Sequence, residues 1–263
     1  SIVFAGIGTF VVLLLSAAVA LDAARRIGRP APLPAALGPL VPRLSLAQRL
    51  QHFALVAAFV VLVVTGLPLR FPESEALASL YLAMGGLRGA RAAHHGAGAL
   101  LAAAGLAHAV YALVLLARAR LDVRCAWPML PARQDVRDAR ALTGYQLGLR
   151  PEPPTFDRHT FRSKIHYFAV AFGLPVMVAS GFVLGFPVAI GNHLPDVAIG
   201  MAHLAHRDEA LAAIAIVVVW HLYLVHVAPR PHHRFLTWID GRITRGRWLA
   251  EHGREAARTK ETP

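Results

Sequence analysis

The chain has 263 residues, of which 56% are hydrophobic and only 16% are charged. A soluble domain of this size usually has about half apolar and about a quarter charged residues, so this composition predicts an integral membrane protein. The formal net charge of +12 does not indicate a nucleic-acid partner, because the basic residues flank apolar segments instead of covering a soluble face. The single cysteine, Cys125, excludes an internal disulfide, a cysteine-ligated iron–sulfur cluster and a four-cysteine zinc site within the chain.

Five segments are long and apolar enough to cross a membrane as helices, since about 20 such residues span ~30 Å of hydrocarbon. Each ends at Pro, Gly or clustered Arg, which is typical of helix ends at a membrane interface. The sequence therefore predicts an all-α integral membrane protein with spans at residues 2–21, 51–67, 94–116, 164–186 and 210–227.

The first segment lies where a signal peptide would lie. No basic residue precedes it, and Arg25, Arg26 and Arg29 follow it, which favours a retained helix with its N-terminus outside over a cleaved signal. Because Ser1 stands in place of an initiator methionine, a continuation upstream of Ser1 is left open.

Lysine and arginine are distributed unequally between the two sides of the predicted bundle. Three segments on one side hold 23 of the 27 and two on the other side hold four: 22–50, 117–164 and 228–263 against 68–93 and 186–209. Since basic loops remain in the cytoplasm, this predicts a bacterial inner-membrane protein with a periplasmic N-terminus and a cytoplasmic C-terminus. We expect the Arg-rich tail to face anionic lipid or a partner.

The chain is predicted to have three parts: an N-terminal anchor and linker at residues 1–42, a four-helix domain at 43–229 and a basic tail at 230–263. No internal repeat with a convincing period is visible. The loop 119–163 is long for a connection without structure, so a short amphipathic helix near residues 135–142 is expected on the membrane surface.

Fourteen histidines are unusual in so apolar a chain. Ionisable side chains inside membrane spans are costly, and they usually face a cofactor, a cavity or a partner. Seven of these histidines fall in the predicted spans, at their ends or at their mouths: His52, His94, His108, His166, His206, His221 and His226.

Two pairs of histidines return to nearly the same helix face. His94 and His108 are 14 residues apart, about 40° around the helix and ~21 Å along it. His206 and His221 are 15 residues apart, about 60° and ~22 Å. Two parallel helices of this kind could hold two cofactors stacked across the membrane, and neutral imidazole is an axial ligand of haem iron. His94 would then pair with His206 near the outer face. His108 would pair with His221 near the inner face.

The inner side has more histidines than one haem needs. His52 begins the second predicted span and His226 ends the fifth, so the spacing leaves open a third haem between them. His203 lies 18 residues before His221, on the same helix face, and is the alternative to His206.

Four motifs follow one another in the last four predicted spans: Arg49-Leu-Gln-His52-Phe with Thr65-Gly66, His94-His-Gly-Ala-Gly98, Lys164-Ile-His-Tyr with Ser180-Gly181, and His206-Arg-Asp-Glu-Ala210 with Trp220-His221-Leu-Tyr223. In this order they resemble the di-haem cytochrome b subunits of formate dehydrogenases and nickel–iron hydrogenases, a family that includes thiosulfate-reductase-type anchors. The resemblance covers about residues 43–229. It implies a four-helix haem-binding bundle, to which segment 2–21 adds one N-terminal transmembrane helix.

Carried over by position, the resemblance implies an outer haem b between His94 and His206. It implies an inner haem b between His52 and His221, whereas helical spacing alone predicts that His108 pairs with His221. The 15-residue interval in the last helix is also one residue longer than the simplest family pattern. Two haems are therefore expected, a third is left open, and the inner ligand is either His52 or His108.

Stacked haems between the two faces of a membrane move electrons across it. The resemblance implies quinone or quinol as the membrane partner, near the inner haem. Quinone reduction consumes protons, and four titratable residues at the inner end are candidate donors: His166, Lys164, Tyr167 and Asp157. Lys164 and Tyr167 are also residue types that anchor helices at the interface.

The chain has no nucleotide-binding glycine motif and no cysteine cluster, so chemistry on a soluble substrate is expected on another subunit. We expect a periplasmic redox partner, either a multihaem cytochrome c or an iron–sulfur or catalytic subunit. The alternative is a metal or proton transporter, which predicts acidic residues within spans and ligands that converge at one depth. No Asp or Glu lies within the five predicted spans, and the histidines divide between two depths, so we favour a membrane b-type cytochrome.

Overall fold

The computed structural model describes residues 2–28, 38–228 and 236–260. Within these residues, four helical segments are long and apolar enough to cross a membrane. They are α2 (Leu46–Arg70), α4 (Gly86–Arg118), α7 (Phe161–Gly185), and the run Asp196–Val227, which comprises α9 (Asp196–Ala215) and two π-helical stretches, η1 (Ile216–His221) and η2 (Tyr223–Val227). The all-α membrane fold is confirmed. The first predicted span is also helical, as α1 (Ile2–Gly28).

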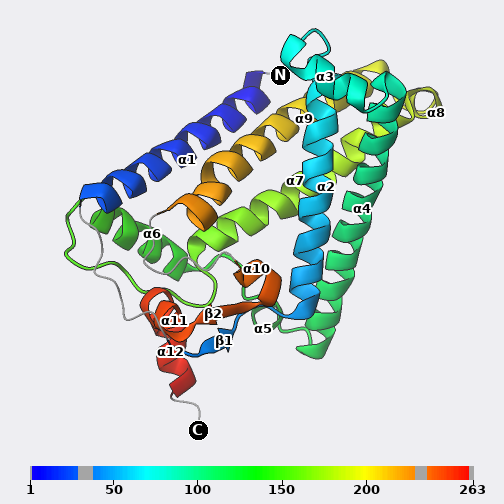
Figure 1. Ribbon diagram of the computed structural model, residues 1–263. Helices are drawn as coiled ribbons and strands as arrows, with labels where there is room; N and C mark the ends of the chain where they lie inside the picture. Colours follow the sequence, from blue (N-terminus) through cyan, green and yellow to red (C-terminus); the bar gives the residue numbers. More distant parts are fainter. Residues whose placement is uncertain (1, 29–37, 229–235, 261–263) are drawn as a thin grey trace.

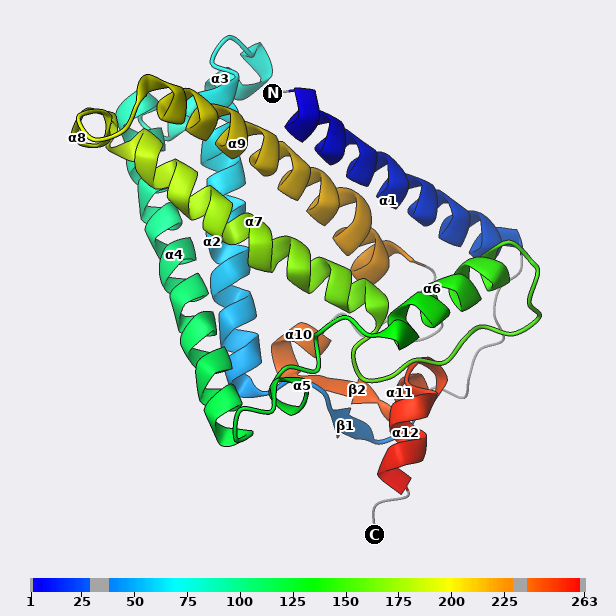
Figure 2. The same cartoon turned by 180° about the vertical axis from the view of Figure 1, so that it is seen from behind.

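The four long helices form two hairpins (Figure 1). Helix α2 packs along α4 and is joined to it through α3 (Glu75–Ala83), whereas α7 packs along α9 and is joined to it through α8 (Pro187–Gly191). Both connections lie at the same end of the molecule, which we call the α3–α8 end, and Figure 2 shows this from behind. Helix α1 lies outside the hairpins, against α9 and η1.

The first helices of the two hairpins correspond position by position. Both α2 and α7 have 25 residues, and their N-caps, Ser45 and Thr160, each accept a hydrogen bond from the backbone three residues later at 3.2 Å. With this offset of 115 residues, the pair Thr65-Gly66 in α2 corresponds to Ser180-Gly181 in α7. The correspondence is structural, and the apolar residues between these positions differ enough to hide it in the sequence.

A carboxylate joins α1 to the rest of the bundle. Asp22 is only 4% exposed, and its two oxygens accept hydrogen bonds from the Tyr223 hydroxyl at 3.0 Å and from Gln146 Nε2 at 2.9 Å. Arg162 Nη2 lies 3.5 Å from the same carboxylate. Because buried charges need such partners, these contacts fix the position of α1 against η2 and α7.

A polar cap closes the end of the bundle opposite α3 and α8, which we call the basic end. It contains α5 (Val123–Ala126), α6 (Arg133–Gln146), α10 (Thr237–Asp240), α11 (Arg245–Glu251) and α12 (Gly253–Lys260). Strand β1 (Leu40–Pro42) pairs antiparallel with β2 (Arg242–Thr244), so the segment before α2 and the C-terminal segment meet. Helix α6 confirms the helix expected near residues 135–142. The two short strands were not predicted.

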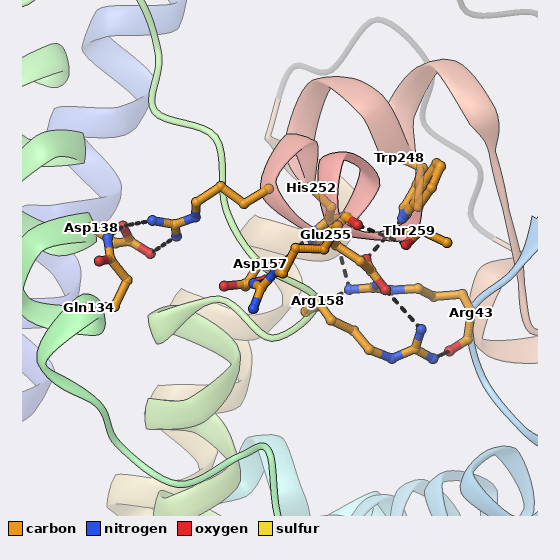
Figure 3. Close-up of polar contacts among 11 residues, drawn as sticks. Arg43, Gln134, Asp138, Asp157, Arg158, Trp248, His252, Glu255 and Thr259 are labelled. Atoms are coloured by element: carbon orange, nitrogen blue, oxygen red, sulfur yellow. Dashed lines mark hydrogen bonds and ion pairs between the residues drawn. The ribbon is translucent and has the colours of Figure 1, made fainter. Parts of the chain in front are cut away.

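Glu255 is the centre of the contacts that hold the C-terminal helices (Figure 3). Its carboxylate accepts from Arg43 Nη1 at 2.9 Å, from Arg158 Nη1 at 3.0 Å and from Trp248 Nε1 at 2.9 Å. Burial alone would raise the pKa of Glu255, but the hydrogen bonds from Trp248 and Arg158 lower it below its usual range.

His252 is held in its neutral form beside this cluster. Its Nδ1 donates to the Asp157 carbonyl at 2.7 Å, and Arg43 Nη2 lies 3.2 Å from its Nε2, which must then accept. Burial, with the nearby Arg43 charge, lowers the pKa of His252 to about 4.

This histidine should make the cap less stable in acid. Since the pKa is lowered only in the folded cap, the opened cap binds a proton first as the pH falls below about 6.5. Between pH 7.5 and pH 5 we expect the free energy of opening β1 and β2 to fall by roughly 2 kcal/mol.

Amide hydrogen exchange of these strands, corrected for its intrinsic pH dependence, measures the change. His252→Gln should reduce this pH dependence, while the same substitution at the exposed His193 should leave it intact. Equal pH profiles for wild type and His252→Gln would contradict the assignment.

Candidate functional site

His94 of α4 and His206 of α9 face each other across the two hairpins, with ring centroids 6.2 Å apart. Each imidazole is fixed by a hydroxyl from the first helix of its own hairpin. Thr65 Oγ1 lies 2.9 Å from His94 Nδ1, and Ser180 Oγ lies 3.0 Å from His206 Nδ1. The two corresponding positions of α2 and α7 therefore support the two rings in the same way.

The hydroxyl geometry defines which ring nitrogen is free. Thr65 Oγ1 donates to the Val61 carbonyl at 2.7 Å, and Ser180 Oγ donates to the Val176 carbonyl at 2.6 Å. A hydroxyl has one proton, so each oxygen must accept from the imidazole Nδ1–H. The Nε2 lone pair of both rings is then available to a metal, an arrangement typical of metal-binding histidines.

Glycines let these rings approach the neighbouring helices. A Cβ at Gly66 would lie 3.3 Å from His94 Cε1, and a Cβ at Gly181 would lie 3.2 Å from His206 Cε1. Gly98, one turn after His94, has no atom within 4 Å of where its Cβ would be. The site thus has close contact where the rings are held and open space beside them.

A second pair of histidines lies nearer the basic end. His52 of α2 and His221 of η1 have ring centroids 6.5 Å apart. The His52 Nδ1 atom is buried without a hydrogen-bond partner in the described part of the chain, and Trp238 of α10 packs against the ring at 5.8 Å. His166 of α7 packs on the other ring, with its centroid 4.7 Å from that of His221.

Both pairs have a separation at which the two rings could hold one haem iron between them. Imidazole nitrogens bind metals at about 2.0–2.1 Å and lie about 1.1 Å from the ring centre, so two rings on opposite sides of one ion have centres roughly 6 Å apart. Within the described residues, no group of three or more His, Cys, Asp or Glu side chains has an arrangement that could hold a metal ion. Two-residue sites fit haem, whose macrocycle supplies the other four ligands, better than zinc, which takes three or four protein ligands.

The π-helical turns explain how His206 and His221 share a face at a spacing of 15 residues. A π-helix has more residues per turn than an α-helix, and it arises where an extra residue is accommodated inside a helix. The stretch η1 begins at Ile216, between the two histidines, and ends at His221. The long interval is therefore compatible with two stacked sites.

His108 is not brought to His221. Its Nδ1 lies 2.7 Å from Gln51 Oε1 and its Nε2 lies 2.9 Å from the Tyr167 hydroxyl, so both ring nitrogens have partners. His226 lies half-buried in η2, five residues beyond His221. His203, the alternative to His206, is exposed.

The four candidate proton donors occupy different places. Lys164 donates to Asp135 at 2.9 Å and lines, with Asp157 and His159, a cavity of about 490 Å³ at the basic end. Burial, with the Arg43 and Arg158 charges, lowers the pKa of His159 to about 4. His166 and Tyr167 lie apart from this cavity, at His221 and at His108 respectively.

The sequence interpretation missed two features of the site. It treated Thr65 and Ser180 only as members of the family motifs, with no role for their hydroxyls, although their equal distance from the N-caps of α2 and α7 marks them as equivalent. It also placed the start of the last span at residue 210, but the helix begins at Asp196. The expectation that no acidic residue lies in a span is therefore wrong, because Asp208 and Glu209 belong to this helix.

One family model, described as prokaryotic cytochrome b561, matches residues 43–238. The match contains both histidine pairs and both hairpins, and it leaves α1 outside. No curated protein sequence matches the chain.

Proposed function

The chain belongs to the prokaryotic cytochrome b561 family and is a multi-pass membrane b-type cytochrome of electron transfer, and from this premise we propose that it moves electrons through two haems across the bacterial inner membrane. One end of the path meets a periplasmic redox partner, and the other end meets the quinone pool. Substrate chemistry belongs to the partner, either a multihaem cytochrome c or an iron–sulfur or catalytic subunit.

The two opposed histidine pairs carry this proposal. His94 and His206 would hold one haem, and His52 and His221 would hold the other, since both pairs have ring centroids close to the roughly 6 Å of bis-histidine ligation. Haem iron supplies the one-electron chemistry by cycling between the ferric and ferrous states. The protein orients the rings of His94 and His206 through Thr65 and Ser180.

The remaining histidines have other roles in this proposal. His108 is engaged at both nitrogens and joins α4 to α2 and α7 through hydrogen bonds. His52 is already opposed to His221, so we do not assign a third haem to His52 and His226.

The orientation follows from the basic residues. Sequence segments 22–50, 117–164 and 228–263 hold 23 of the 27 Lys and Arg residues, and their described parts lie at the basic end, so we place this end in the cytoplasm and the α3–α8 end in the periplasm. The N-terminus is then periplasmic and the C-terminus cytoplasmic. The His94–His206 pair faces the periplasmic partner, and the His52–His221 pair faces the cytoplasmic side.

Quinone exchange belongs at the cytoplasmic end in this arrangement. Reduction of a quinone takes two electrons and two protons, so titratable groups near cytoplasmic water are required. His166 beside His221, and Lys164 and Asp157 at the 490 Å³ cavity, are the donors that we propose. Tyr167 would act through its hydrogen bond with His108.

The haem content of the purified protein tests the proposal. We expect a pyridine haemochrome assay to give two b-type haems per chain, because the structure has two opposed histidine pairs. A folded protein without haem would overturn the electron-transfer function and favour a transporter. A value of three would contradict the assignment of His226.

A further inference from the structure

Glu209 is an acidic residue inside the membrane helix that carries two proposed haem ligands. It follows His206 by three residues, which is about 60° around the helix and ~4.5 Å nearer the basic end. His221 lies 12 residues further on, so the carboxylate is at a depth between the two histidine pairs. Carboxylates at such positions are costly, and by default they indicate a function.

The fold provides a notch for this side chain. A Cβ at Gly173 of α7 would lie in direct overlap with Glu209 Oε1, so the carboxylate occupies the space that the glycine leaves. Gly173 is seven residues before Ser180 and therefore on the same face of α7 as the hydroxyl that holds His206. The next residue, Leu174, packs against Gly105 of α4, which places this turn of α7 inside the bundle.

No hydrogen bond or ion pair to Glu209 occurs within the part of the chain that the structure describes. Its neighbour Asp208 is paired with Arg207 at 2.6 Å, so these two charges offset each other. The other titratable groups around this level are His203 and His206 on α9 and His94 and His95 on α4. After Tyr167, α7 has no titratable residue up to its end at Gly185, and α1 has none before Asp22.

We propose that Glu209 is a proton-accepting group whose protonation is coupled to reduction of the haem held by His94 and His206. The inference rests on the proposed haem function. The Glu209 carboxylate would take up one proton from water and become a neutral carboxylic acid when a haem held by His94 and His206 is reduced by a one-electron donor. Oxidation reverses both changes. The coupling has a simple electrostatic cause, because an added electron in a low-dielectric environment raises the proton affinity of a nearby carboxylate.

Redox titration of the haem-loaded protein tests this coupling. The haem bands are followed with dithionite as reductant and ferricyanide as oxidant, between pH 6 and pH 9. In the wild type we expect one of the two midpoint potentials to fall with rising pH over part of this range, by at most about 59 mV for each tenfold change in proton concentration. Glu209→Gln should abolish this dependence, because a neutral amide takes the place of the titrating group. Glu209→Asp should retain it, and the exposed Glu73→Gln should match the wild type.

The possible results distinguish a failure of the proposed haem function from a failure of the proposed role of Glu209. A folded wild type without haem would remove the proposed function itself. Two haems in Glu209→Gln, together with a wild-type pH dependence, would overturn the role of Glu209 and leave the electron-transfer function in place. If Glu209→Gln does not fold, the wild type still decides the matter through its reduced-minus-oxidised infrared difference spectrum. The coupling requires that a protonated carboxyl band appears on reduction, and its absence would refute the proposal.

Discussion

His94→Ala is expected to remove one of the two haems while the other remains bound. The alanine leaves His206 without an opposing ring, and an iron with one protein ligand is held far more weakly than one with two. The haemochrome value should fall from two to one per chain, and one of the two components of the redox titration should disappear. The His52–His221 pair lies about four helical turns nearer the basic end and should keep its haem.

The adjacent histidine is a matched control for this variant. His95 is exposed, on a different face of α4, and its ring lies near Gly185 of α7. His95→Ala should therefore retain both haems and both redox components. Loss of haem from His95→Ala but not from His94→Ala would show that His95, and not His94, faces His206, and would contradict the rotation of α4 in the structure.

His52→Ala and His108→Ala are expected to differ by one haem. His52 is the ring opposed to His221, so its removal should abolish the cytoplasmic-side haem and leave a content of one. In His108→Ala both hydrogen bonds, to Gln51 and Tyr167, are lost. That variant should keep two haems and be less stable by about 1–2 kcal/mol, the usual cost of such bonds.

This comparison distinguishes the two assignments that the sequence leaves open. The 14-residue spacing in α4 favours His108, and the family resemblance implies His52. Haem content and thermal unfolding on the same preparations separate ligation from stability. Loss of a haem in His108→Ala, with two haems retained in His52→Ala, would return the inner ligand to His108.

The ends of the membrane helices could be predicted more closely than their starts. The predicted ends at residues 67, 116, 186 and 227 lie within three residues of Arg70, Arg118, Gly185 and Val227 in the structure. Prolines, glycines and arginines stop a helix through local sterics and charge, which a sequence displays directly. The predicted starts of these helices were too late in the sequence, because α4 and α9 contain polar turns before their apolar segments. In α9 the polar turn is Arg207 to Glu209, and eleven residues of the helix, 196–206, precede it.

The histidines at the site could be identified from the sequence, but their partners could not. The energetic cost of an ionisable side chain in a membrane span, together with helical spacing, singles out residues such as His94 and His206. Whether His52 or His108 reaches His221 depends on the rotation of α2 against α4, which is set by packing between helices and has no local signal. The π-helical stretch η1 likewise depends on the whole hairpin. The β1–β2 pairing joins segments about 200 residues apart, and strands of three residues have too short a pattern to be recognised.

The division of the bundle into two hairpins has a consequence for how the protein is made. In the proposed assignment each haem takes one ligand from α2 or α4 and the other from the segment Asp196–Val227. A ribosome adding about 5–20 residues per second needs roughly 6 to 22 s to proceed from His94 to His206. During that time the first hairpin has entered the bilayer with two half-built sites. Haem can be bound stably only after the last membrane helix has been synthesised. A chain that holds both haems has therefore inserted both hairpins.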